Sequence, residues 1–142
     1  MSEPQPSHRS ARRKARKYAL DVLFAADLQE VDPTAIVAQG LVTTQTALPA
    51  YTRELVEGVW DNRFEVDGLI AAHLKQGWTV ERMPAVDRAL ARIAVYEITH
   101  TATPPEVAIS EAVALAAELS TDTSPAFLTG VLGAVARAQT AA

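Results

Sequence analysis

The side chains best suited to chemistry in this sequence are six cations between Arg9 and Lys17, almost half of its thirteen Lys and Arg residues. Five of them follow an i, i+3, i+4, i+7, i+8 spacing, which places them within about 140° of arc on one helical face. We call these five residues the basic row: Arg9, Arg12, Arg13, Arg16 and Lys17. Guanidinium groups form paired hydrogen bonds with phosphates, so the row predicts that this helix binds a polyanion.

A solvated helix face, a charged tail and a membrane-surface helix are the other interpretations of such a row. Solvated faces usually mix charges of both signs, whereas residues 9–17 contain no acid. A membrane-surface role conflicts with Leu20, Leu23 and Phe24, which continue the same arc and are needed for a core. We therefore interpret the row and one neighbouring lysine as a nucleic-acid-binding surface: Arg9, Arg12, Arg13, Lys14, Arg16 and Lys17.

Charge is divided unevenly along the chain. Residues 1–20 carry a net charge of +5 and residues 21–142 a net charge of −9, which together give the overall −4. An anionic body repels a polyanion wherever the cations do not cover it. A nucleic acid should therefore be confined to one edge of the molecule.

Composition limits the other classes of function. The 142 residues predict one domain over residues 9–142, with residues 1–8 as a flexible tail. The absence of cysteine excludes a disulfide scaffold and a thiol nucleophile, and no His occurs in a metal-binding spacing. No glycine-rich phosphate loop and no apolar run of about 18 residues occurs. We expect a soluble cytoplasmic protein that is not an enzyme and holds no metal or cofactor.

Proline, glycine and capping residues predict an all-α fold. The first helix should end near Gln29, and Asp32 should cap a short helix that Gly40 ends, followed by a loop over residues 42–48. Helical patterns resume at Pro49, with a possible break near Asn62. Three further helices should begin at prolines, the second after a capping box formed by Thr103 and Glu106: Pro84, Pro105 and Pro125. This gives a bundle of about seven helices.

Several polar or aromatic residues fall at informative positions on these later helices. Glu97 lies on the buried arc of the helix after Pro84, where a carboxylate is costly unless it is paired or accepts backbone N–H bonds. We interpret it as a buried cap on the N-terminus of a neighbouring helix rather than as a catalytic group. Asp87, Arg88 and Arg92 should lie on the outer face of that helix, either as ordinary surface or as a docking patch. Phe127 either belongs to the core or stacks on a base. On the helix after Pro105, we expect these residues to be buried: Ile109, Ala112, Val113, Ala116 and Leu119.

Four blocks of the sequence together resemble the NusB family of bacterial transcription antitermination factors. They are residues 12–24 (RRKARKYALDVLF), 85–98 (AVDRALARIAVYEI), 107–116 (VAISEAVALA) and 124–133 (SPAFLTGVLG). The stretch at residues 119–122 is similar to that of actinobacterial members. The resemblance implies an all-helical fold of two small subdomains. It also implies binding of the boxA element in nascent ribosomal RNA transcripts, as a complex with NusE, a small-subunit ribosomal protein.

The resemblance further implies that this complex joins NusA, NusG and RNA polymerase to suppress premature termination. Carried onto this chain, Arg12, Arg13 and Arg16 match the RNA-contacting arginine motif, and Phe127 matches an aromatic residue beside the RNA. The region where RNA and NusE meet corresponds to three residues: Asp87, Arg88 and Arg92. The chain departs from the family pattern at four positions: Asp21, Ala117, Thr123 and Thr129.

Two alternatives to an antitermination factor remain open at the level of sequence. The basic helix could dock on an acidic protein, which would make the chain a protein-interaction scaffold. The chain could also be a stand-alone NusB-like RNA-binding module of an RNA-modification system. The sequence likewise leaves open whether the free protein is a monomer or pairs with a second copy.

Overall fold

The computed structural model describes residues 8–44 and 48–141, and these residues form seven α-helices and one 3-10 helix, with no strand among them. The predicted tail at residues 1–8 lies outside the described residues, except for His8, which begins the first helix. The helices are α1 (His8–Gln29), α2 (Pro33–Thr44), α3 (Ala50–Asp61), α4 (Arg63–Ala71), η1 (Val80–Arg82), α5 (Ala85–His100), α6 (Pro105–Leu119) and α7 (Ser124–Ala141). The prediction of an all-α fold is confirmed.

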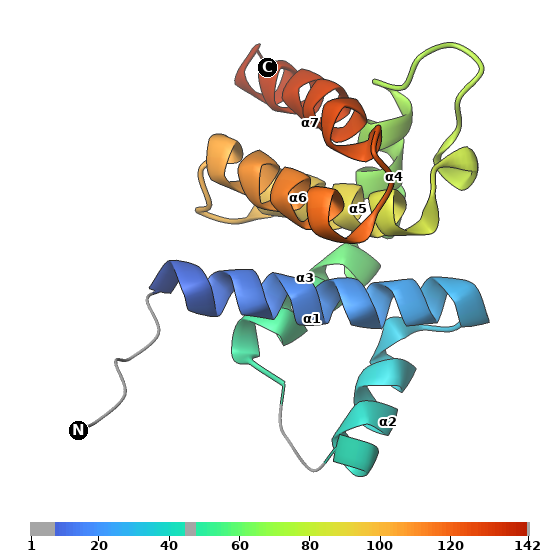
Figure 1. The fold of residues 1–142 in the computed structure, drawn as a ribbon, viewed down its shortest axis with the longest axis vertical. Coiled ribbons are helices and arrows are strands. Elements are labelled where there is room, and N and C mark those ends of the chain that lie inside the picture. Colours follow the sequence, from blue (N-terminus) through green and yellow to red (C-terminus); the bar gives the residue numbers. More distant parts are fainter. Residues whose placement is uncertain (1–7, 45–47, 142) are drawn as a thin grey trace.

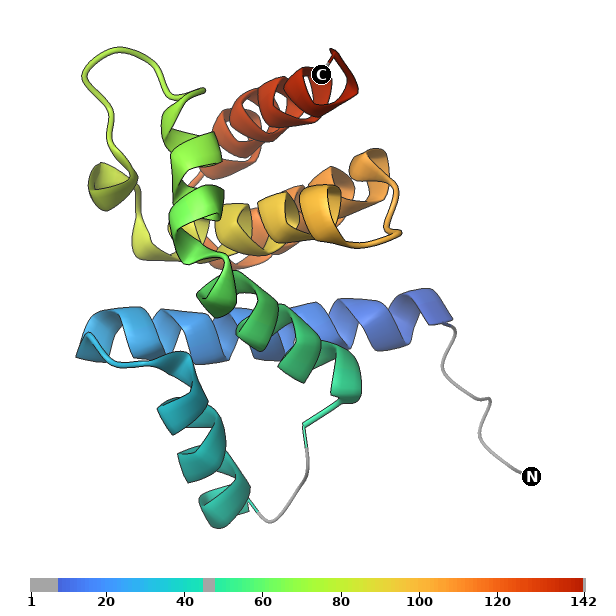
Figure 2. The same cartoon turned by 180° about the vertical axis from the view of Figure 1, so that it is seen from behind.

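The helices form two subdomains stacked on each other (Figure 1). The long helix α1 lies across the molecule, with α2 and α3 on one side of it and α4 to α7 on the other. Seen from behind, α3 crosses α1 and leads directly into α4, so the α3–α4 junction joins the two subdomains (Figure 2). Helix α5 packs against both α1 and α3, which makes it the central element of the fold.

Helix ends follow the predicted capping signals in part. Asp32 accepts a hydrogen bond from the backbone N–H of Thr34 at 2.8 Å, as an N-cap residue should. The predicted break at Asn62 is confirmed, because α3 ends at Asp61 and α4 begins at Arg63. However, α2 continues through Gly40 to Thr44, so the loop predicted from residue 42 was placed too early. A glycine inside a helix costs only about 1 kcal/mol, which neighbouring contacts can offset.

The core lies between the two subdomains and within the upper one in Figure 1, which is formed by α4 to α7. Leu90, Ile93 and Tyr96 of α5 are buried as predicted. Further side chains that are almost fully inaccessible to solvent come from α3, α4 and α7: Leu55, Ile70, Leu128 and Leu132. Helix α1 contributes Ala19, Leu20 and Leu23 to the same core, so its second half is anchored while its first half carries the cations.

Among the described residues, we find no helix with both the length and the apolar character that crossing a membrane would require.

Candidate nucleic-acid interface

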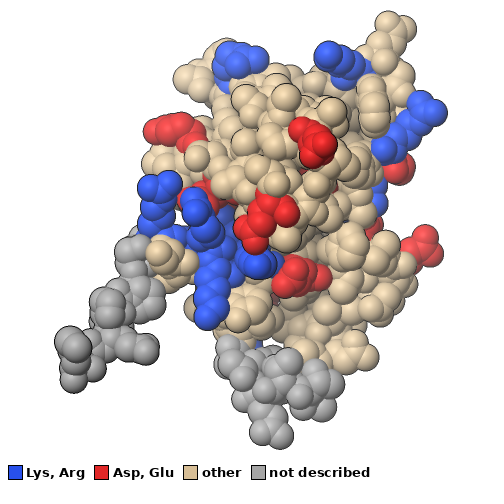
Figure 3. Space-filling model, viewed as in Figure 1, with Lys and Arg blue, Asp and Glu red and all other residues tan. Residues whose placement is uncertain are grey.

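The cations of α1 do not share one environment. In the free protein the side chains of Arg9 and Arg13 are 76% and 48% exposed, whereas that of Arg16 is only 6% exposed. Lys14 and Lys17 are exposed, and Arg12 is half-buried. Figure 3 shows Lys and Arg side chains gathered over the first half of α1. The basic row is therefore exposed along most of its length, but not at Arg16.

Arg16 points into the protein, where it forms an ion pair with Glu97 of α5. Its Nε donates to Glu97 Oε1 at 2.9 Å and its Nη2 donates to Oε2 at 2.8 Å. Burial alone would lower the pKa of Arg16, but the hydrogen bonds and charge of Glu97 raise it overall. The expectation that Arg16 lies open to a ligand is therefore wrong. Because α5 packs against this part of α1, the side chain at that position faces a neighbouring helix.

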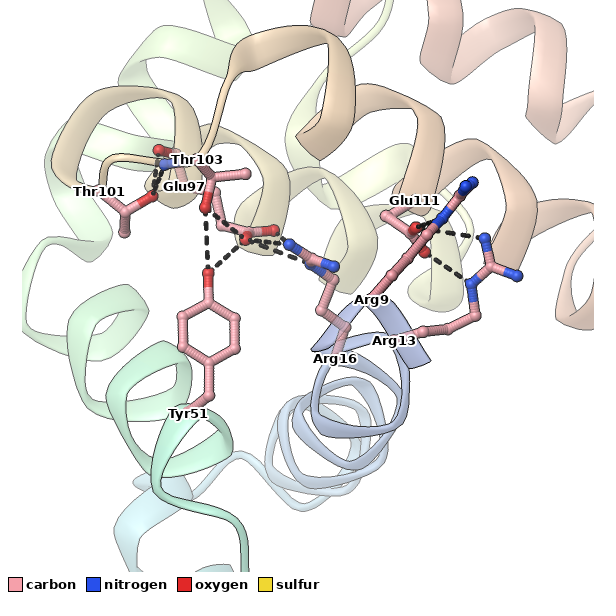
Figure 4. Close-up of polar contacts among 8 residues, drawn as sticks. All are labelled: Arg9, Arg13, Arg16, Tyr51, Glu97, Thr101, Thr103 and Glu111. Atoms are coloured by element: carbon pink, nitrogen blue, oxygen red, sulfur yellow. Dashed lines mark hydrogen bonds and ion pairs between the residues drawn. The ribbon is translucent and has the colours of Figure 1, made fainter. Parts of the chain in front are cut away.

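Glu97 is the centre of a buried network that joins three helices (Figure 4). Besides Arg16, its carboxylate accepts hydrogen bonds from the hydroxyl groups of Tyr51 on α3 and Thr103 in the α5–α6 loop. The prediction that Glu97 is buried is confirmed. Its interpretation as a cap on a helix N-terminus is wrong, because the partners of its carboxylate are the side chains of Arg16, Tyr51 and Thr103. The predicted capping box is wrong, because Thr103 donates to Glu97 and α6 has no side-chain cap.

Arg9 and Arg13, two of the exposed cations, share a carboxylate partner on α6. Arg13 Nε donates to Glu111 Oε2 at 2.8 Å, and Arg9 Nε lies 3.6 Å from Glu111 Oε1. Burial alone would raise the pKa of Glu111, but Arg13 lowers it overall, and Glu111 in turn raises the pKa of Arg13. One carboxylate thus partly neutralises two guanidinium groups, and both of these still reach solvent.

A cleft of about 940 Å³ opens beside the basic row, between the start of α1, the start of α3 and the α5–α6 loop. Its walls include Arg9, Arg12, Tyr51 and residues 101–103. The guanidinium carbon of Arg12 lies 3.6 Å from the centroid of the Tyr51 ring, so this cation is held by a cation–π contact. The cleft gives the cations of α1 a concave surface, whose lining on the α6 side includes Glu111.

Asp87 was predicted to lie on the outer face of α5, and this is wrong. Its side chain is buried and accepts hydrogen bonds from Ser120 Oγ at 2.5 Å and Ser124 Oγ at 2.9 Å. These two serines lie at the end of α6 and the start of α7. Asp87 therefore ties together three helices, because the α6–α7 turn covers the first turn of α5.

Arg88 and Arg92 are also engaged within the protein. Arg88 donates two hydrogen bonds to Asp27 Oδ2, at 2.9 and 2.6 Å, and Nη1 donates to three carbonyl groups of residues 80–83. Arg92 forms a paired contact with Asp67 at 2.8 and 2.9 Å. The side chains of Arg88 and Arg92 are 15% and 22% exposed, so only a small part of each, its exposed rim, is accessible to a ligand.

Phe127 is partly buried and lies beside an aromatic residue that the sequence analysis did not single out. Its ring centroid is 6.0 Å from that of Trp78, whose side chain remains exposed. Tyr51 and Glu111 were missed as well. Glu111 was missed because the buried face of α6 comprises Ala108, Glu111 and Leu115 as well as Ala112 and Ala116, whereas Leu119 is exposed. Only the packing of α6 against α5 and α7, together with the ion pairs that Glu111 forms with α1, reveals this.

The described residues contain no group of three or more His, Cys, Asp or Glu side chains arranged to hold a metal ion. Fold and site together define a class: a small all-helical binding protein with a cluster of exposed cations on the first half of one helix of an anionic body. Within that class, the chain belongs to the NusB family, whose family model matches residues 13–137.

Comparisons with individual proteins agree with this assignment. The chain is 52% identical over 130 residues to the transcription antitermination protein NusB of Salinispora tropica, covering 89% of this chain and 95% of the relative. The NusB structure of T. maritima is 28% identical, with a TM-score of 0.77 and coverage of 96% and 93%. A structure of the antitermination factors NusB and NusE in complex with double-stranded RNA has the same fold, with 24% identity, a TM-score of 0.79 and coverage of 90% and 97%. The resemblance to NusB, including its actinobacterial members, is confirmed.

Proposed function

We propose that this protein is an RNA-binding transcription antitermination factor. It recognises boxA-type RNA in nascent ribosomal RNA transcripts together with NusE and helps RNA polymerase to avoid premature termination. The observation that carries the proposal is the concentration of exposed cations on the first half of α1, on an otherwise anionic body. Family membership supports it, since curated relatives are named transcription antitermination protein NusB.

The contacts with RNA follow from which cations are accessible. Arg9, Arg12, Arg13, Lys14 and Lys17 hold phosphates, and the exposed edges of the guanidinium groups donate the hydrogen bonds. Arg16 contributes by fixing α1 against α5 rather than by direct contact. Phe127, with Trp78 beside it, provides an aromatic surface on which a base can stack. Contacts of this kind give modest affinity alone, so a partner that adds RNA surface makes physical sense.

NusE is the partner proposed here, and a structure with the same fold contains NusB and NusE together with RNA. The proposed meeting region of RNA and NusE is the surface around Arg88 and Arg92, through the exposed rim of these side chains. Asp87 supports that surface from below through Ser120 and Ser124. NusA, NusG and RNA polymerase complete the assembly, which acts in the bacterial cytoplasm. The protein acts by binding rather than by catalysis.

Salt dependence of RNA binding tests the proposal. If five cations each neutralise one phosphate, log K should fall with log salt at a slope of about −3.5, at about −0.7 per contact with a single strand. Replacing Arg12, Lys14 and Lys17 by Ala leaves the pair of Arg13 with Glu111 intact and should flatten the slope to about −1.4. Fluorescence anisotropy with a boxA-type RNA, with and without NusE, measures both values.

The matched control is Arg137→Ala, which removes an exposed cation from the distant end of α7 (Figure 1). It should leave the slope unchanged, and a scrambled RNA should bind more weakly than boxA. An unchanged slope in the triple variant would rule out α1 as the RNA site. Equal, negligible binding of both RNAs would instead favour a protein-interaction scaffold.

A further inference from the structure

Glu111 stands out because a carboxylate in the middle of the proposed phosphate-binding surface should weaken it. We propose instead that Glu111 is a positioning residue for RNA. Its buried carboxylate holds Arg13, and secondarily Arg9, so that the remaining N–H groups of these guanidinium groups face the RNA phosphates. This inference rests on the proposed function and names a residue of α6 that acts on RNA through α1.

The hydrogen-bond geometry around Arg13 supports a positioning role. Nε donates to Glu111 Oε2 at 2.8 Å and Nη2 donates to Oε1 at 3.2 Å, so the carboxylate occupies one edge of the guanidinium group (Figure 4). A guanidinium group has five N–H donors, and this arrangement uses two of them. The three donors on Nη1 and Nη2 are left for a phosphate, which guanidinium groups bind in a paired, planar geometry.

Burial distinguishes Glu111 from a carboxylate that merely competes with RNA. Its side chain is only 2% exposed, whereas those of Arg13 and Arg9 are 48% and 76% exposed. The acid therefore lies beneath the cations and cannot leave the site to make room for a phosphate. The cations cover it and present their outer edges to solvent. A phosphate arriving from solvent adds to this pair rather than replacing it.

A second carboxylate of α6, Glu118, can be compared with Glu111. Glu118 lies 3.6 Å from Lys17, farther along the same two helices, but both side chains are exposed, at 59% and 49%. Such a pair is solvated and holds neither partner in place. Glu111 and Glu118 thus bear the same charge beside the same cationic surface and differ in whether they fix a guanidinium group. Comparing variants of the two residues therefore distinguishes a positioning role from the effect of a negative charge alone.

The test measures affinity for a boxA-type RNA in the full-length protein with three single variants. Glu111→Gln removes the charge, Glu111→Asp keeps the charge but withdraws the carboxylate from Arg13, and Glu118→Gln is the matched control. We expect both Glu111 variants to weaken binding about three- to tenfold, because an unfixed Arg side chain loses its rotamer freedom on binding. Glu118→Gln should leave affinity unchanged or raise it up to about twofold.

A double-mutant cycle with Arg13→Ala completes the experiment. In the Arg13→Ala background, Glu111→Gln should have little further effect, because the side chain that it positions is gone. Thermal midpoints identify any variant that is simply unfolded, and Glu111→Asp, which keeps the ion pair's charge, then carries the test. The inference is overturned if Glu111→Gln behaves like Glu118→Gln, if Glu111→Asp binds as the wild type does, or if the two substitutions are additive.

Failure of the proposed function gives a different result. In that case the wild type does not bind boxA RNA, or Arg13→Ala binds it as well as the wild type does. If Arg13→Ala weakens binding and the Glu111 variants do not, only the positioning role is wrong.

Discussion

At the scale of single residues, two arginines separated by one helical turn have opposite roles. Arg13 carries an exposed guanidinium group over Glu111, whereas Arg16 is enclosed with Glu97, Tyr51 and Thr103. Placing charges in a protein interior requires that their hydrogen-bonding groups be satisfied, and among the described residues every buried side-chain N or O atom has a partner. The network thus makes a buried ion pair tolerable, and it fixes the helix that presents the other cations.

Glu97→Gln tests this structural role. The substitution keeps the shape of the side chain but leaves the buried charge of Arg16 uncompensated, which should cost about 3–5 kcal/mol in the free energy of unfolding. Urea denaturation followed by circular dichroism measures the change. Glu118→Gln, in an exposed pair, should cost less than about 1 kcal/mol. A loss below about 1 kcal/mol for Glu97→Gln would show that the network contributes little to stability.

At the scale of helices, the orientation of α1 depends on how closely its neighbours approach one another. Helices α3 and α5 pack where Gly58 lies against the ring of Tyr96. Helix α3 also contacts α1, because Thr52 donates a hydrogen bond to the carbonyl of Ala15 at 2.8 Å. A small residue on α3 therefore sets the distance between the helices that carry Tyr51 and Glu97.

Gly58→Ala should destabilise the protein even though alanine favours helices. A Cβ atom at this position would lie 2.1 Å from Tyr96 Cζ, and overpacking of this kind costs about 1–3 kcal/mol. The higher helix propensity of alanine offsets about 1 kcal/mol of this cost. Gly68 of α4 offers a matched control, since nothing lies within 4 Å of its Cβ position. Thermal denaturation should show Gly58→Ala below the wild type and Gly68→Ala at or above it.

At the scale of the whole molecule, ion pairs join α1 to the upper subdomain along its length. Arg13 pairs with Glu111 of α6, Arg16 with Glu97 of α5, and Asp27 with Arg88 of α5. The same helix carries the cluster of exposed cations, so the uneven charge distribution of the molecule and the contact between its two subdomains both depend on α1. Conditions that neutralise carboxylates should weaken this cohesion.

Acid should therefore reduce the difference in stability between the wild type and Glu111→Gln. Because the folded protein holds the pKa of Glu111 below its ordinary value of 4.5, the stability from this group is present above that value. It is lost as pH falls through the lower, folded pKa. The wild type should exceed Glu111→Gln in unfolding free energy at pH 7, and the difference should shrink below about pH 4. A constant difference from pH 7 to pH 3 in urea titrations would contradict this.

The sequence by itself determined the helical composition, most helix boundaries and the location of the cations, because these depend on local periodicity, capping residues and prolines. It also placed Leu90, Ile93, Tyr96 and Glu97 on the buried side of α5. These are properties of one helix at a time.

Tertiary structure alone decided what each polar side chain meets. Arg16 lies 81 residues from Glu97 and Arg13 lies 98 residues from Glu111, so no local pattern could pair them. The burial of Asp87, likewise, depends on the α6–α7 turn. Periodicity gives the direction of a side chain from its own helix axis, but only the packing of distant helices determines whether that direction leads to solvent or to a carboxylate.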